Sequence, residues 1–139
     1  MTESGNTTAF LVPLAPLLPA ALSGAWVGFR WMPTLVYAPA SGIAQELYFR
    51  AALLPVLLRL LDGKVGRAIL LHSVLFGLWH IPRAYMGAPI APLPAAIAVA
   101  LVTALAGLGW GWQVQHDKTV VWALAQHIVF LMVMSLFGM

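Results

Sequence analysis

The feature that most constrains this chain is an apolar run at residues 40–61 that carries Gln45, Glu46 and Arg50 in its middle. The run is long enough for a membrane-spanning helix, which needs roughly 20 residues to cross a hydrocarbon core of about 30 Å. A charged group at that depth costs about 2.5–3.5 kcal/mol on insertion scales, so such groups usually face other protein and mark a functional pathway. We therefore expect this segment to lie in a helical bundle, with its polar side chains turned to the interior.

The spacing within this run gives the polar residues different partners. Glu46 and Arg50 are four residues apart, so they lie on one helix face in the order that favours an ion pair. Gln45 lies about 100° around the helix from Glu46 and faces another neighbour. Two interpretations are open for this segment: a buried structural ion pair beside an amide, or part of an active site.

The composition indicates whether this chain folds in water or in a membrane. Hydrophobic residues make up 62% of the 139 residues and charged residues 8%, whereas a soluble domain has about 25% charged residues. The chain is therefore expected to be a membrane protein. Its net charge of +3 does not indicate a nucleic-acid partner, because the seven Lys and Arg are scattered between apolar runs and form no basic stripe. The lack of cysteine excludes disulfides, thiolate metal ligands and a cysteine nucleophile.

The pattern of apolar runs predicts an all-α, polytopic transmembrane helix bundle. We expect about five spans, at residues 9–29, 40–61, 65–81, 93–114 and 119–137. Residues 1–8 form a short polar N-terminus without Lys or Arg, which is not typical of a cleaved secretory signal, so the first run is interpreted as a span. The small residues at 20–25 leave a cleaved signal open as the alternative. The last four spans, within residues 40–139, are expected to form the core. Four prolines between residues 82 and 94 predict a loop.

Local signals refine these boundaries. Pro55 is expected to bend the second span one turn after Arg50, and Asp62 with Gly63 to end it. Residues 115–118 predict a short polar turn before the last span. Three glycines of the fourth span favour close helix approach: Gly107, Gly109 and Gly111.

The distribution of basic residues predicts the orientation in a cell inner or plasma membrane. Loops on one side carry four Lys and Arg and loops on the other side carry two, which favours an inside N-terminus. The larger group is Arg59, Lys64, Arg67 and Lys118, and the smaller is Arg30 and Arg83.

Three spans carry groups suited to acid–base chemistry: Glu46 on the second, His80 on the third and His127 on the fifth. A carboxylate and two imidazoles that converge in a bundle can activate a water by general-base action, or can hold a divalent metal such as zinc. His72 is interpreted as a hydrogen-bonded packing residue. His116, in the polar turn, is expected to be solvated.

The spacing of these residues resembles a known family. Residues 45–50, Gln-Glu-Leu-Tyr-Phe-Arg, are similar to its Glu-Glu-x-x-x-Arg motif, and Phe76 to His80 matches its Phe-x-x-x-His motif. His127 to Leu131 falls on its His-x-x-x-Asn/Asp motif. On these motifs, about residues 42–132 resemble the CPBP family of intramembrane proteases, also called the Abi or CAAX-protease and bacteriocin-processing family.

The resemblance implies an enzyme: an intramembrane endopeptidase that hydrolyses a peptide bond near the membrane surface of a membrane-anchored or C-terminally processed protein. It implies that the first glutamate of the motif, at position 45, and His80 activate the attacking water, and that His127 is the oxyanion or substrate-binding group. Arg50 becomes a structural counter-ion, and Phe76 packs beside the site. Both a mechanism with a divalent metal and a glutamic mechanism without one are compatible with it.

Two positions depart from the family pattern. Gln45 replaces the first glutamate, and an amide does not take a proton from water at neutral pH. Leu131 replaces the Asn or Asp of the third motif. Three alternatives follow: a protease that uses Glu46 as its base, a catalytically inactive binding or immunity module in the membrane, and a proton or ion relay through Glu46, His80 and His127.

Overall fold

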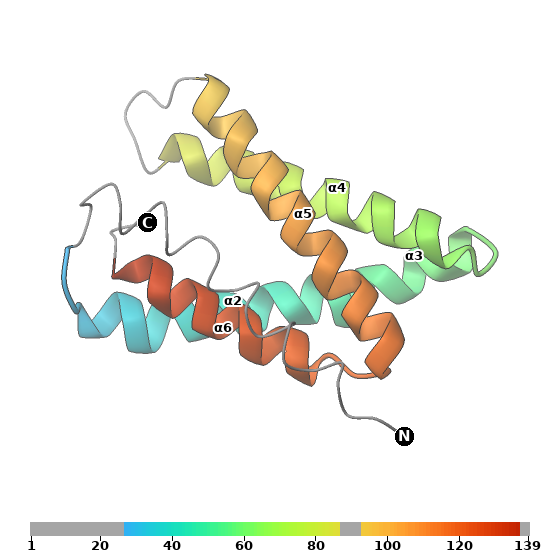
Figure 1. Ribbon diagram of the computed structural model, residues 1–139, viewed down its shortest axis with the longest axis horizontal. Coiled ribbons are helices and arrows are strands. Elements are labelled where there is room, and N and C mark those ends of the chain that lie inside the picture. The colour runs from blue at the N-terminus through green and yellow to red at the C-terminus, as the bar shows by residue number, and fades with distance from the viewer. Residues whose placement is uncertain (1–26, 87–92, 137–139) are drawn as a thin grey trace. The chain divides into compact units, whose positions relative to one another are not determined.

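The computed structural model describes residues 27–86 and 93–136. All regular structure in these residues is helical and forms four successive helices (Figure 1), so the all-α prediction is confirmed. The first helix is continuous from residue 32 to residue 60 and consists of η2 (Met32–Tyr37), α2 (Ala38–Glu46), η3 (Leu47–Leu53) and α3 (Leu54–Leu60). The other three are α4 (Val65–Met86), α5 (Leu93–Asp117) and α6 (Val121–Ser135).

Two segments of the first helix, η2 and η3, are π-helical. Each ends two residues before a proline, at Pro39 and Pro55 respectively. Proline has no N–H and its ring crowds the carbonyl four residues earlier, and a wider π turn is one way to accommodate this in a helix. The sequence predicted a bend at Pro55; the structure shows a change from π- to α-helical winding at that point.

The chain divides into two compact units, with boundaries between Glu46 and Leu47 and between Val120 and Val121. In the unit formed by residues 1–46 and 121–139, α2 packs against α6 (Figure 1). Gly42 permits this approach, because a Cβ there would lie 3.0 Å from Cγ1 of Ile128. The hydroxyls of Thr34, on η2, and Ser135, on α6, form a buried hydrogen bond of 2.7 Å.

In the other unit, residues 47–120, α4 and α5 pack closely and antiparallel (Figure 1). The predicted close approach is confirmed at Gly107 and Gly111, where an added Cβ would lie 3.2 Å from Phe76 and 3.3 Å from Ile69. The prediction is wrong for Gly109, which has no such neighbour within 4 Å. The tightest contact is at Gly77, where an added Cβ would fall onto the carbonyl oxygen of Ala100.

The turn between α3 and α4 follows the sequence closely. Asp62 and Gly63 both have positive φ, of 52° and 74°, and the Gly63 N–H donates to the Leu58 carbonyl at 2.8 Å. This left-handed ending is a common way to satisfy the last carbonyls of a helix. The prediction that Asp62 and Gly63 end this helix is confirmed.

Three predicted boundaries are wrong. The first helix begins at residue 32, ahead of the predicted start at residue 40, and α4 continues through Pro82 to Met86. One proline removes only one backbone hydrogen bond, and neighbouring helices can satisfy the carbonyl it leaves, so the helix need not stop there. At the other end, α5 includes the polar residues up to Asp117 and turns at Lys118, whose φ is 56°.

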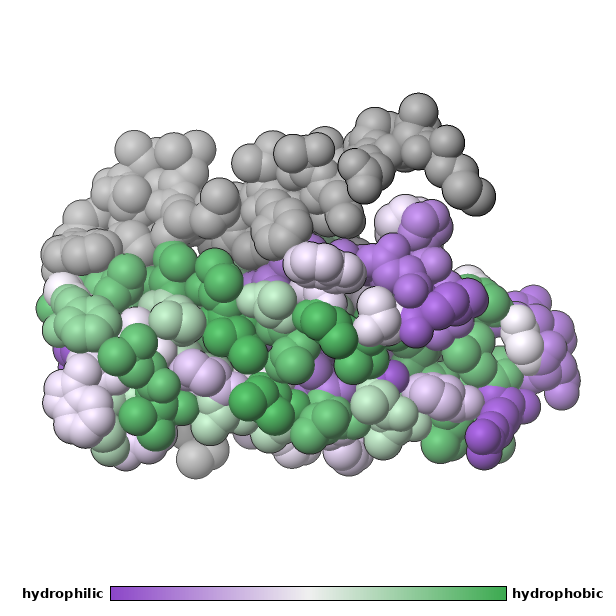
Figure 2. Space-filling view, turned by 90° about the horizontal axis from the view of Figure 1, so that it is seen from below, coloured by the Kyte–Doolittle hydropathy of each residue, from purple (hydrophilic) through white to green (hydrophobic). Residues whose placement is uncertain are grey.

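Two helical segments, Val65–Pro82 and Leu93–Asp117, are long and apolar enough to cross a membrane, and α6 is a shorter apolar helix. Many large apolar side chains of the described residues are exposed, and hydrophobic residues cover much of the face shown in Figure 2. The count of five spans and the N-inside orientation stay predictions. The predicted span at residues 9–29 lies mainly outside the described residues.

Candidate active site

Glu46 and His127 form a buried carboxylate–imidazole pair. Glu46 is the last residue of α2 and His127 lies on the second turn of α6, so the packing of these two helices brings them together. The imidazole Nδ1 is 2.7 Å from the carboxylate Oε1. Their exposed fractions are 1% for Glu46 and 2% for His127, so water does not screen the interaction.

This hydrogen bond determines the chemistry of the ring. An ionised carboxylate only accepts hydrogen bonds, so Nδ1 of His127 carries the proton and donates it. In the neutral imidazole Nε2 is then the basic nitrogen. A carboxylate behind the ring also stabilises the imidazolium that forms when Nε2 takes a proton. The pair is therefore equipped to act as a general base.

Gln45, the residue before Glu46, makes a separate contact. Its amide Nε2 donates to the hydroxyl of Ser41, one turn earlier on α2, at 2.8 Å. Gln45 is buried and Glu46 contacts another helix, as expected for side chains about 100° apart on one helix. Ser41 was missed by the sequence interpretation, although its position four residues before Gln45 is a usable signal.

His80 lies in the other unit, on α4. Its Nδ1 hydrogen-bonds the carbonyl of Phe76 at 2.7 Å, within the same helix. A carbonyl only accepts, so Nδ1 of His80 also carries the proton and Nε2 is again the basic nitrogen. The Phe76 ring contacts the His80 ring edge to face, with centroids 4.7 Å apart. Phe76 therefore packs beside His80, and its predicted place beside a catalytic site stays a prediction.

Arg50 is buried in the same unit, with an exposed fraction of 1%. The guanidinium carbon lies 4.0 Å from the ring centroid of Phe76 and 5.3 Å from that of Trp110. Such cation–π contacts favour a desolvated cation by about 2 kcal/mol. The ion pair of Arg50 with Glu46 stays a prediction, because the two residues belong to different units. Trp110 had no signal in the sequence that linked it to Arg50.

Two further histidines differ from their predictions in one respect each. His72 is fully buried and packs between Phe49 and Phe76, with ring centroids 5.9 and 6.4 Å away. It is a packing residue as predicted, but neither ring nitrogen has a hydrogen-bond partner among the described residues. His116 is exposed as predicted, and it also pairs with Asp117 at 2.9 Å.

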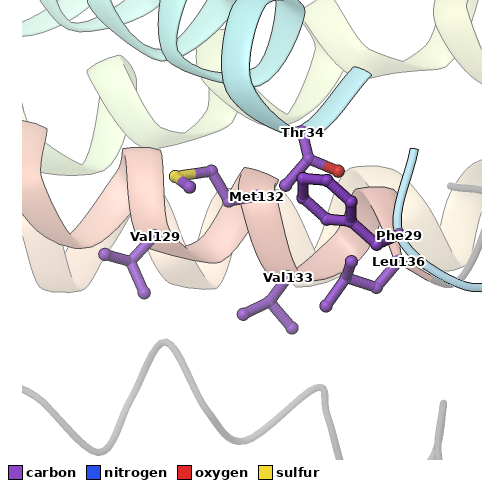
Figure 3. A pocket seen from close by; sticks show the side chains of 6 residues that line it. All are labelled: Phe29, Thr34, Val129, Met132, Val133 and Leu136. Carbon is purple, nitrogen blue, oxygen red and sulfur yellow. The ribbon is translucent and has the colours of Figure 1, made fainter. Parts of the chain in front are cut away.

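The described residues contain no group of three or more His, Cys, Asp or Glu side chains that is arranged to hold a metal ion. They do form an apolar hollow of about 320 Å³, shown in Figure 3, between the start of the first helix and the second half of α6. Its lining residues are Phe29, Thr34, Val129, Met132, Val133 and Leu136. It carries no titratable side chain, so it is not itself a site of acid–base chemistry.

The fold and these polar groups define a class: an all-helical protein with membrane-length apolar helices and a buried carboxylate–imidazole pair. Residues 25–133 match the family model described as type II CAAX prenyl endopeptidase Rce1-like, and the chain belongs to this family. Searches of curated proteins and of solved structures gave no match. The predicted family is confirmed, and membership implies an intramembrane protease.

Proposed function

We propose that this protein is an intramembrane endopeptidase that cleaves a peptide bond near the membrane surface in a membrane-anchored or C-terminally processed protein. The observation that carries the proposal is the buried hydrogen bond of 2.7 Å between Glu46 and His127. The Glu46–His127 pair can act as the general base, and the side chain of Gln45 takes no part in it. The absence of a glutamate at position 45 is therefore compatible with activity.

In the proposed reaction, water gives a proton to Nε2 of His127 while its oxygen attacks the scissile carbonyl carbon. Glu46 holds the ring in the required tautomer and stabilises the imidazolium. The imidazolium then returns the proton to the departing amine nitrogen as the C–N bond breaks. This gives His127 the role of the base, whereas the sequence interpretation assigned water activation to Glu46 with His80 and left the oxyanion to His127.

The substrate is proposed from the family and from the membrane helices. A protease of this family acts on protein, and a peptide anchored in the bilayer reaches a membrane-embedded site by lateral diffusion. A farnesylated peptide that ends in Cys-aliphatic-aliphatic-X is the first probe to use, because the family is described as a CAAX prenyl endopeptidase. A second probe, a peptide anchored by an apolar helix, covers substrates without a prenyl group.

The test is cleavage of both quenched probes by purified protein in lipid nanodiscs, beside the variants Glu46→Gln and His127→Gln. We expect the parent to cleave at least one probe and each variant to lose about 10²–10⁴-fold in kcat/KM, the usual contribution of a general base. Gln113→Met, which alters a buried glutamine of α5, is the control for folding. Unchanged activity in both Glu46→Gln and His127→Gln would overturn the proposed mechanism.

A second candidate is a membrane protein of this fold that binds peptide without cleaving it. The amide at Gln45 and the apolar Leu131 at the third motif favour it, because both remove polar groups that the family pattern contains. It predicts no cleavage by the parent and a gain of cleavage in Gln45→Glu.

A further inference from the structure

The side-chain carbonyl of Gln45 is a buried acceptor without a visible donor. Gln45 has an exposed fraction of 9%. Its Nε2 is used in the hydrogen bond to Ser41, while Oε1 has no hydrogen-bond partner within residues 27–86 and 93–136. The large majority of buried side-chain polar atoms in proteins are hydrogen-bonded, and an exception needs an explanation. A donor that arrives with a ligand is one such explanation.

The position of this acceptor is fixed by its surroundings. The bond to Ser41 holds the amide nitrogen, so the carbonyl oxygen of the same planar group is directed away from Ser41. The next residue is Glu46, which pairs with His127, and one turn earlier Gly42 contacts Ile128, the residue after His127. Gln45 therefore lies on the segment of α2 that faces the reactive part of α6.

The chemistry of an amide suits one kind of donor. Glu46 already carries the negative charge at this point, and a second carboxylate beside it would be repelled, whereas an amide accepts a hydrogen bond without charge. In a membrane, each backbone N–H of an extended peptide needs an acceptor because water is absent. An extended substrate that lies along the Glu46–His127 pair brings such N–H groups to the site.

We propose that Oε1 of Gln45 accepts a hydrogen bond from a backbone N–H of the peptide substrate close to the scissile bond. Gln45 is then a positioning residue that selects an extended backbone, and Ser41 orients its amide. This inference rests on the proposed function in one respect, that a peptide lies against Glu46 and His127. It does not require that the peptide is cleaved.

The test uses amide-to-ester scanning of the farnesylated probe, in which one peptide N–H at a time is replaced by an ester oxygen on either side of the scissile bond. Binding is measured by fluorescence anisotropy in nanodiscs before appreciable cleavage, for the parent protein and for Gln45→Met. Loss of a hydrogen bond weakens binding by about 3- to 10-fold. In the parent, we expect the ester probe to bind more weakly than the amide probe at one position. In Gln45→Met, the two probes should bind equally at that position.

Ser41→Ala keeps the acceptor but removes its anchor, so it should show a smaller ester effect at the same position. Gln113→Met is the matched control, since it removes another buried glutamine amide, and the ester effect should be unchanged. Equal ester effects in the parent and in Gln45→Met, the lack of any ester effect, or no binding of the probe would each overturn the inference. An ester effect on binding that disappears in Gln45→Met, without any cleavage of the probe, would support the inference and overturn the proposed proteolysis. The two failures are therefore distinguishable.

Discussion

The two units hold their histidines by different means. In one, the Nδ1–H of His127 donates to a carboxylate; in the other, the Nδ1–H of His80 donates to a backbone carbonyl of its own helix. Both bonds select the same tautomer and leave Nε2 as the basic nitrogen. Only the carboxylate adds a full negative charge that stabilises an imidazolium. The comparison shows that both Nδ1–H bonds orient an imidazole ring, and that the bond at His127 also places a carboxylate beside the ring.

The largest expected effect tests this difference directly. His127→Gln should reduce kcat/KM by about 10³-fold, since it removes the proposed general base. His80→Gln should reduce it by a smaller factor, about 10-fold, because glutamine retains a polar group at that position while the carboxylate-supported base is intact. The measurement is initial-rate kinetics on the farnesylated probe in nanodiscs. Equal losses in the two variants would break the comparison and restore His80 as the water-activating residue.

The packing of the two units differs as well. Close helix contact in the α4–α5 pair depends on glycine, and Gly77→Ala should destabilise the protein by about 1–3 kcal/mol, because the new methyl group would overlap the Ala100 carbonyl and lie 2.9 Å from the Ala104 Cβ. The free energy of unfolding is measured by SDS titration in mixed micelles.

The matched control for that measurement is Gly109→Ala, where the described residues leave open space. It should be neutral or stabilising, since alanine favours a helix over glycine by about 1 kcal/mol. A loss of stability at Gly109→Ala as large as that at Gly77→Ala would show that glycine matters here for a reason other than close approach.

The burial of Arg50 gives a third test within the second unit. Trp110→Leu should destabilise the protein by about 1–2 kcal/mol, since it removes one of the two aromatic faces beside the guanidinium. The comparison variant is Trp110→Leu in an Arg50→Met background, measured by the same SDS titration. If the cation–π contact matters, the effect of Trp110→Leu should be smaller in that background. An identical loss in both backgrounds would assign the effect of Trp110 to apolar packing alone.

The sequence predicted the parts of this molecule that follow from local rules. The all-α class came from the pattern of apolar runs, the end of the first helix from Asp62 and Gly63, and the contacts at Gly107 and Gly111 from the small size of glycine. These features depend on residues near one another in the chain or on one type of side chain.

Other features require contacts between distant residues and had no such signal. The sequence placed Glu46 and His127 among the candidate site residues. These two residues are 81 positions apart in the chain, and their pairing depends on how α2 packs against α6. The aromatic contact of Arg50 with Trp110 has the same origin. The end of α4 was misplaced because Pro82 was treated as a stop, although it lies inside the helix.

The smallest expected effect concerns the second hydrogen bond that joins the first helix to α6. Ser135 has one hydroxyl proton and gives it to the Met132 carbonyl at 2.6 Å, so Thr34 donates to Ser135 at 2.7 Å. Thr34→Val keeps the shape of the side chain and removes the donor, which should cost about 0.5–1.5 kcal/mol. A double-mutant cycle with Ser135→Ala, followed by SDS titration, isolates the coupling between the two residues.

Because Ser135, the partner of Thr34, lies about two helical turns from His127 on α6, Thr34→Val should leave kcat/KM on the farnesylated probe nearly unchanged while it lowers stability. This outcome would separate the contacts that hold α6 in place from the pair that reacts. A loss of kcat/KM together with the loss of stability would mean that the register of α6, set in part by this hydroxyl pair, controls the geometry of the Glu46–His127 pair. The comparison between the two histidines would then also include helix register, because the Nδ1–H bond of His80 lies within its own helix and is not set by the register of α6.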